Sequence, residues 1–149
     1  MPLTLSELRR YEVWVILLVM DDKLEEMPEY MDYSRRALRT AHLAFDDDDW
    51  VGAINRAYYA IFYAANAVLE LEGLERSKHS GALGLFRQRY IKTRLIEPEF
   101  SVIYGKAFES RSEGDYERTK FPSQADAQQA IEGAQRFVER IDRFLKGRR

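Results

Sequence analysis

The chain has 149 residues, of which 46% are hydrophobic and 13% aromatic, and its formal net charge at pH 7 is −2. This composition excludes an intrinsically disordered chain and is typical of one globular domain with its own core. The absence of cysteine excludes a disulfide scaffold and thiolate metal sites, and it fits a reducing cytoplasm. With 23 basic against 25 acidic residues, nucleic-acid binding would require a local basic patch.

An apolar run, VWVILLVM, occupies residues 13–20. It is far shorter than the roughly 20 residues that span a bilayer. Arg9 and Arg10 precede it as in a secretory signal, but acidic residues follow directly and no small-residue cleavage site is present. We expect the run to pack on this domain or on a sister subunit. Residues 1–30 are predicted to be an N-terminal extension of a domain at 31–149, without membrane insertion.

The first predicted helix covers residues 32–45 and ends at four consecutive aspartates, 46–49. Consecutive carboxylates point in different directions, which favours a solvated loop over a cation site. Asp49 is placed to cap the next helix. That helix, from Trp50 to a stop at Gly73, has apolar residues on two adjacent stripes, so we expect it to be buried in the middle of a bundle.

Three further helical segments follow. Ser77 or Ser80 caps the first, Pro98 occupies the first turn of the second, and Ser123 with Asp126 begins the third. In the second of these, we expect Gly114 to end the helix just after an arginine. Short connections between four or five amphipathic helices predict an all-α, up-and-down bundle.

Three separated stretches, NRAYYAIFYAANAVLELEGLERSKHSG, FESRSEGDY and AIEGAQRFVERI, together resemble the HEPN domain family over roughly residues 32–145. The resemblance implies a four- or five-helix bundle that commonly forms homodimers. It also implies pairing with a minimal nucleotidyltransferase in a toxin–antitoxin system. Active members are metal-independent ribonucleases with an Arg, four to six intervening residues and a His, placed across the dimer interface; in some members the partner adenylylates a Tyr two residues beyond that His.

Only part of this motif is present. Arg111 matches the motif arginine, but the position after four intervening residues holds Tyr116, and no His lies in the window. Tyrosine titrates near pH 10 and histidine near 6.5, so Tyr116 is a poor general base. His79, from the separate SKHSG stretch, would supply this group if the fold brought it close. Asp115 either orients Arg111 for phosphate or forms a structural ion pair with it.

Other candidate binding residues lie nearby in the sequence. Lys78 and His79 precede a helix start, where backbone N–H groups attract anions. Asn55, Arg56 and Tyr59 share the central helix with Tyr63 and Asn66, at a spacing that forms a polar and aromatic ribbon. Its tyrosines either stack on bases, pack inward with their hydroxyls in water, or line a subunit interface. If its Asn and Arg residues are buried, we expect them to hydrogen-bond across helices or to face a cleft.

These residues predict a HEPN component of a toxin–antitoxin-like pair that binds RNA or a nucleotide phosphate and a minimal nucleotidyltransferase, with little or no catalysis. One alternative is a metal-independent ribonuclease toxin that uses Arg111 with Tyr116 or His79. A second is a structural helical adaptor. The sequence calls for no metal and no cofactor, and it favours a homodimer in the cytoplasm.

Overall fold

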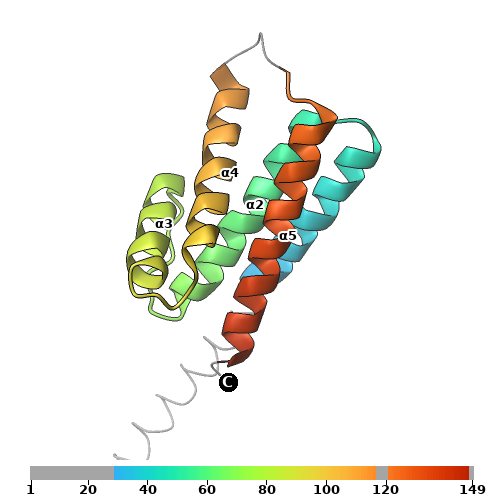
Figure 1. Cartoon of the computed structure of the whole chain (residues 1–149). Coiled ribbons are helices and arrows are strands. Elements are labelled where there is room, and N and C mark those ends of the chain that lie inside the picture. Colours follow the sequence, from blue (N-terminus) through green and yellow to red (C-terminus); the bar gives the residue numbers. More distant parts are fainter. Residues whose placement is uncertain (1–28, 117–120, 148–149) are drawn as a thin grey trace, which may run out of the picture.

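The computed structural model describes residues 29–116 and 121–147, except for the side chains of 112–116. These residues form helices and no strand (Figure 1). A helix at 29–46 is followed by α2 (Trp50–Glu70), α3 (His79–Phe86), the π-helix η1 (Arg87–Ile91), α4 (Pro98–Tyr116) and α5 (Gln124–Gly147). The predicted all-α bundle is therefore confirmed. In the part of the chain that is described, no helix is both long and apolar enough to cross a membrane.

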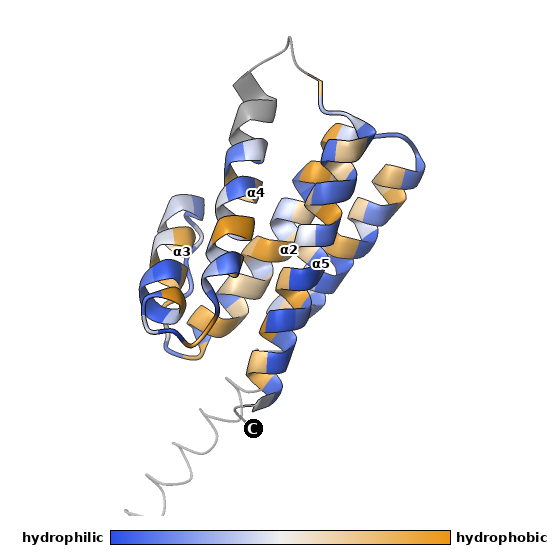
Figure 2. Cartoon of the chain, in the orientation of Figure 1, coloured by the Kyte–Doolittle hydropathy of each residue, from blue (hydrophilic) through white to orange (hydrophobic). Residues whose placement is uncertain are grey.

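The helix α2 lies at the centre of the bundle and contacts α3, α4 and α5. Twelve of its residues are buried, and six of these are alanines. Small side chains on several faces allow neighbouring helices to approach closely, as expected for a helix that is apolar around most of its circumference. By contrast, α5 has one buried face, and hydrophobic and hydrophilic residues alternate along it (Figure 2).

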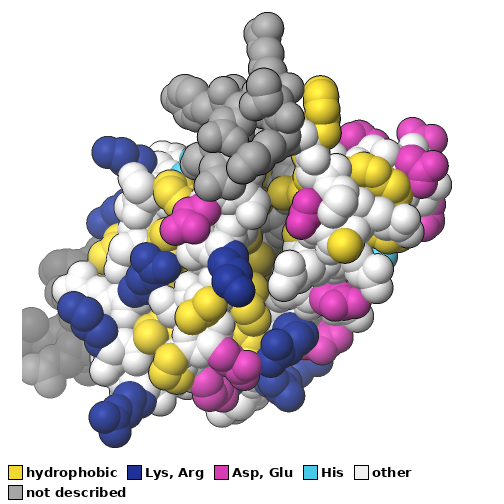
Figure 3. All heavy atoms as spheres, turned by 45° about the horizontal axis from the view of Figure 1, so that its top comes forward, with side chains coloured by type: hydrophobic (Ala, Val, Ile, Leu, Met, Phe, Trp, Pro, Cys, Tyr) yellow, Lys and Arg dark blue, Asp and Glu magenta, His cyan; other side chains and the backbone are white. Residues whose placement is uncertain are grey.

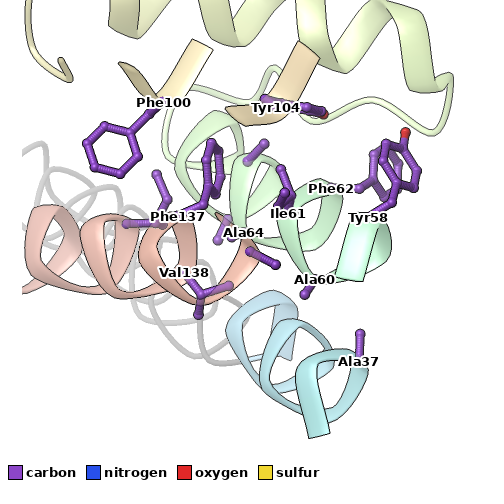
Figure 4. Packing of buried hydrophobic residues seen from close by; sticks show 14 of the residues in the cluster. Ala37, Tyr58, Ala60, Ile61, Phe62, Ala64, Phe100, Tyr104, Phe137 and Val138 are labelled. Carbon is purple, nitrogen blue, oxygen red and sulfur yellow. The ribbon is translucent and has the colours of Figure 1, made fainter. Parts of the chain in front are cut away.

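Aromatic rings from α3, α4 and α5 pack against one another in the core. The ring of Phe137 on α5 lies 5.3 Å from that of Phe86 and 5.6 Å from that of Tyr104, centroid to centroid. Phe100 packs on the same ring at 6.3 Å (Figure 4). Burial of a large side chain contributes roughly 1.5–3 kcal/mol. This cluster therefore holds α3 and α4 against α5, which matters because α3 begins with His79 and α4 carries Arg111.

The predicted helix ends are largely confirmed. The carboxylate of Asp49 accepts a hydrogen bond from Gly52 N at 2.9 Å. Ser123 and Asp126 exchange two hydrogen bonds as a capping box. Gly73 has φ +69° and forms a Schellman motif, in which Leu74 N donates to Leu69 O and Gly73 N donates to Glu70 O.

Two predicted helix ends are wrong. Neither Ser77 nor Ser80 is the N-cap of α3, which is Lys78. The helix α4 does not stop at Gly114 but continues through it to Tyr116. A glycine inside a helix costs only about 1 kcal/mol relative to alanine, which is too little to end a helix by itself. Arg111 consequently lies within α4, more than a turn before its last residue.

Candidate functional site

The first residue of α3 is joined to the middle of α2. His79 Nδ1 lies 2.6 Å from the hydroxyl oxygen of Tyr58, and the two rings are stacked with centroids 5.5 Å apart. The Tyr58 side chain is fully buried, and this burial raises its pKa to about 12 despite the opposing effect of the Arg111 guanidinium. Tyr58 therefore stays protonated at neutral pH and fixes the orientation of the imidazole.

Arg111 lies on the same pair of tyrosines. Its guanidinium carbon is 5.0 Å from the ring centroid of Tyr58 and 5.7 Å from that of Tyr59, within the range of a cation–π contact. Burial lowers the pKa of His79, and the positive charge of Arg111 lowers it further. The fold thus brings Arg111 close to His79, although 31 residues separate them in the sequence.

The loop that carries His79 is held by Asn66. The buried amide of Asn66 donates to Arg76 O at 3.1 Å and accepts from Arg76 N at 2.9 Å. The sequence placed Asn66 in a polar and aromatic ribbon with Tyr59 and Tyr63, and it did not identify the loop at Arg76 as the partner of this amide. Both ends of the amide are used within the protein, because a buried amide without partners would be destabilising.

Tyr59 connects the remaining predicted residues on α2. Arg56 lies over its ring at 4.6 Å and donates a hydrogen bond to Asn55 at 3.2 Å. The His79 ring meets the Tyr59 ring edge-on at 5.7 Å and stacks on Phe62 at 4.4 Å. Tyr59 is only half-buried, so it presents an aromatic surface between two arginines.

Three predicted site residues remain, namely Lys78, Asp115 and Tyr116. Lys78 is the N-cap residue of α3, is exposed, and makes no side-chain capping bond. The side chains of Asp115 and Tyr116 lie outside the described residues. Their relation to Arg111 therefore stays a prediction.

Two tyrosines were missed in the sequence. Tyr58 and Tyr104 both lie on apolar helix faces, where a phenol is easily taken for core. The Tyr104 hydroxyl is buried without a hydrogen-bond partner among the described residues, and burial raises its pKa. In Figure 4 it points from α4 toward the side of the core that holds Tyr58 and Phe62. The available signal was a tyrosine at a buried position of an apolar helix face, because a buried phenol usually has a hydrogen-bond partner.

The arrangement offers a planar cation, an imidazole and an aromatic face on two rigid helices and one fixed helix start. A planar cation is chemically suited to phosphate oxygens, and an aromatic face is suited to stacking on a ring. Within the described ranges, no group of three or more His, Asp or Glu is placed to hold a metal ion.

Comparisons with known proteins agree with this fold. The model of the HEPN domain family matches residues 27–144. A UPF0332 protein of Thermotoga maritima is 31% identical over 127 residues, which cover 85% of this chain and 96% of that protein. The Methanocaldococcus jannaschii protein named "Putative toxin MJ0605" is 32% identical over 129 residues, covering 87% and 96% of the two chains. A second protein of that organism, "Putative toxin MJ0142", is 23% identical over 120 residues, covering 80% and 82%. The chain therefore belongs to the HEPN domain family.

Proposed function

We propose that this chain is a toxin-like HEPN protein that binds RNA or a nucleotide phosphate at the Arg111 site. The observation that supports this most directly is that Arg111 and His79 meet on the same tyrosine pair. The guanidinium is a planar fork suited to two phosphate oxygens. The half-buried Tyr59 ring beside it is suited to stacking on a base.

The positions of these groups also favour a second candidate, a metal-independent ribonuclease. In such a reaction the 2′-oxygen attacks phosphorus, the bond from phosphorus to the 5′-oxygen breaks, and a proton is lost at one oxygen and gained at the other. His79, whose lowered pKa keeps it neutral at pH 7, would take up the first proton. Arg111 would balance the charge that develops on the phosphate.

The hydrogen bond to Tyr58 gives His79 two useful states. When Tyr58 donates to Nδ1, Nε2 carries the proton and donates toward a ligand. When Nδ1–H donates to the Tyr58 oxygen, Nε2 is free to accept a proton. This pairing supplies the acid–base group that the Arg111 motif lacks, and Tyr116 would then be needed only as a hydrogen-bond donor.

The proposed setting is a homodimer that works with a minimal nucleotidyltransferase in the cytoplasm, with residues 1–30 as an extension of the bundle. Two relatives whose printed names include "toxin" support a toxin-like role. If the chain is instead a structural adaptor, Arg111 should matter for stability alone.

The test combines RNA binding with RNA cleavage in EDTA. Purified wild type is compared with Arg111→Ala and His79→Ala, and with Arg143→Ala as a control for an exposed arginine on α5. Fluorescence anisotropy with a labelled single-stranded RNA should show that Arg111→Ala weakens binding by about tenfold or more. The control should bind as wild type does.

The cleavage assay separates the two candidates. Cleavage by wild type that is lost in both Arg111→Ala and His79→Ala would establish the ribonuclease. RNA binding without RNA cleavage would support the non-catalytic binding protein. If wild type neither binds nor cleaves RNA while Arg111→Ala changes only stability, the adaptor interpretation would replace both.

A further inference from the structure

A basic segment begins where the site begins. Residues 76–96 contain six Lys and Arg residues and no Asp or Glu, a net charge of +6. Because the whole chain has a net charge of −2, the other residues together carry −8. We call this segment, which covers α3, η1 and the adjoining turns, the basic arm. Its six cations are Arg76, Lys78, Arg87, Arg89, Lys92 and Arg94.

The cations of the basic arm are exposed, and few are neutralised. Arg89 pairs with Glu72 at 2.6 Å. Lys78, Lys92 and Arg94 make no ion pair with any acid among the described residues. Lys and Arg side chains gather on the flank of the molecule formed by α3 and its neighbouring turn, at the left of Figure 3. This flank is therefore a local positive surface on a protein that is acidic elsewhere.

Two features show that the arm is held in a defined shape. Arg87 donates to the Ser101 hydroxyl at 2.9 Å, and its Nη2 lies against Gly105, where a Cβ would be only 2.5 Å away. At the far end of the arm, Arg94 has φ +62°, a conformation that a residue other than glycine seldom adopts. Such strain persists only where the surrounding structure enforces it.

The basic arm is continuous with the site because His79 is the first residue of α3. The 13 residues of α3 and η1 extend for roughly 20 Å at about 1.5 Å per residue. We propose that the arm binds the phosphate backbone of a single-stranded RNA whose reactive or bound phosphate sits at Arg111. This inference rests on the proposed function and adds a path for the strand beyond the site.

A protein partner with an acidic surface is the competing occupant. Interfaces between proteins are usually anchored by buried aromatic or aliphatic side chains. The helical part of the arm, α3 and η1, has no exposed large hydrophobic residue, and only Leu95 in the following turn is 45% exposed. A surface with cations and no apolar anchor fits a phosphate backbone better.

The experiment compares Lys92→Gln/Arg94→Gln with Arg39→Gln/Arg143→Gln, which removes the same charge from exposed positions on other helices. Each protein is titrated with a labelled 12-nucleotide oligouridylate and with a labelled trinucleotide, between 50 and 300 mM salt. Loss of two phosphate contacts should reduce the slope of log K against log salt by about 1.4 for the 12-mer. The trinucleotide, which reaches only the Arg111 site, should bind both variants as it binds wild type.

The possible results separate this inference from the proposed function. If wild type does not bind the 12-mer, both fail. If wild type binds and Arg111→Ala weakens binding, but the arm variant matches its control, the arm inference alone is overturned, and an acidic protein becomes the better occupant. Equal losses for the 12-mer and the trinucleotide would also overturn it, because the arm would then act through the site.

Discussion

The hydroxyl of Tyr58 and Nδ1 of His79 lie 2.6 Å apart, which joins the central helix to the first residue of α3. Because the Tyr58 pKa is raised to about 12, this contact is made by a neutral phenol across the physiological pH range. The imidazole is therefore oriented by a neutral hydroxyl. Its protonation depends mainly on burial and on Arg111.

The first prediction concerns the titration of His79. Its pKa in the folded protein should lie below 6.5, and Arg111→Gln should raise it, because one of the two causes of the lowering is removed. The folded protein binds fewer protons here than the unfolded chain between the two pKa values. The contribution of His79 to the free energy of unfolding should therefore be fully present above about pH 6.5. It should decrease as the pH falls toward the pKa of His79 in the folded protein.

The measurement is an NMR titration of the His79 ring, together with urea unfolding at several pH values. Arg143→Gln on α5 is the matched control and should leave the titration unchanged. An Arg111→Gln protein whose His79 titrates at the wild-type pKa would contradict the contact described between these residues.

The second prediction concerns the two hydrogen bonds by which Asn66 holds the loop at Arg76. Asn66→Ala removes two hydrogen bonds to the backbone of Arg76 and should decrease the free energy of unfolding by about 1–3 kcal/mol. Asn55→Ala, on the same helix but partly exposed, should cost less than about 0.5 kcal/mol. Urea unfolding monitored by circular dichroism measures both changes. Equal costs would show that the amide of Asn66 does not hold the loop.

The third prediction concerns the aromatic core. Phe137→Ala should destabilise the protein by about 3–5 kcal/mol, because the ring is fully buried against rings of α3 and α4 and its removal leaves a cavity. Phe121→Ala is the control, since this ring is 84% exposed, and it should change stability by less than about 0.5 kcal/mol. Thermal unfolding distinguishes the two at once, and similar melting temperatures would refute the packing.

The fourth prediction compares two helical glycines. Gly84→Ala in α3 meets no atom within 4 Å and should stabilise the protein by about 0.5–1 kcal/mol. Gly105→Ala should gain less, because its Cβ displaces Arg87 from Ser101. In an Arg87→Ala background that difference should disappear. A double-mutant cycle in urea gives the result, and an unchanged difference would mean that another neighbour opposes the Cβ.

Local signals in the sequence were sufficient for most of the fold. The Asp49 cap, the Gly73 stop and the Ser123–Asp126 box depend on residues within one turn of each other, and all three form as predicted. The stop at Gly114 failed because a single glycine carries too small a helix penalty to decide where α4 ends.

The candidate site was less accessible to sequence reasoning. Periodicity shows which side of a helix is buried, but not which residue of a distant segment meets it. The approach of His79 to Arg111 and the polar contact of Tyr58 both depend on how α3 packs against α2 and α4. The partner of Asn66 could not be found from the sequence for the same reason, since it lies across a loop ten residues away.

Alanine is the best helix former and loses no side-chain rotamer freedom when it is buried. The six buried alanines of α2 therefore reduce the entropy lost when this helix orders. We expect α2 to form early in folding together with α5, against which it packs more extensively than against α3 or α4. The loop at Arg76 and the start of α3 would then dock onto a helix that is already present. On this pathway, His79 reaches Tyr58 and Arg111 late, and a chain that has folded only its central pair of helices has no assembled site.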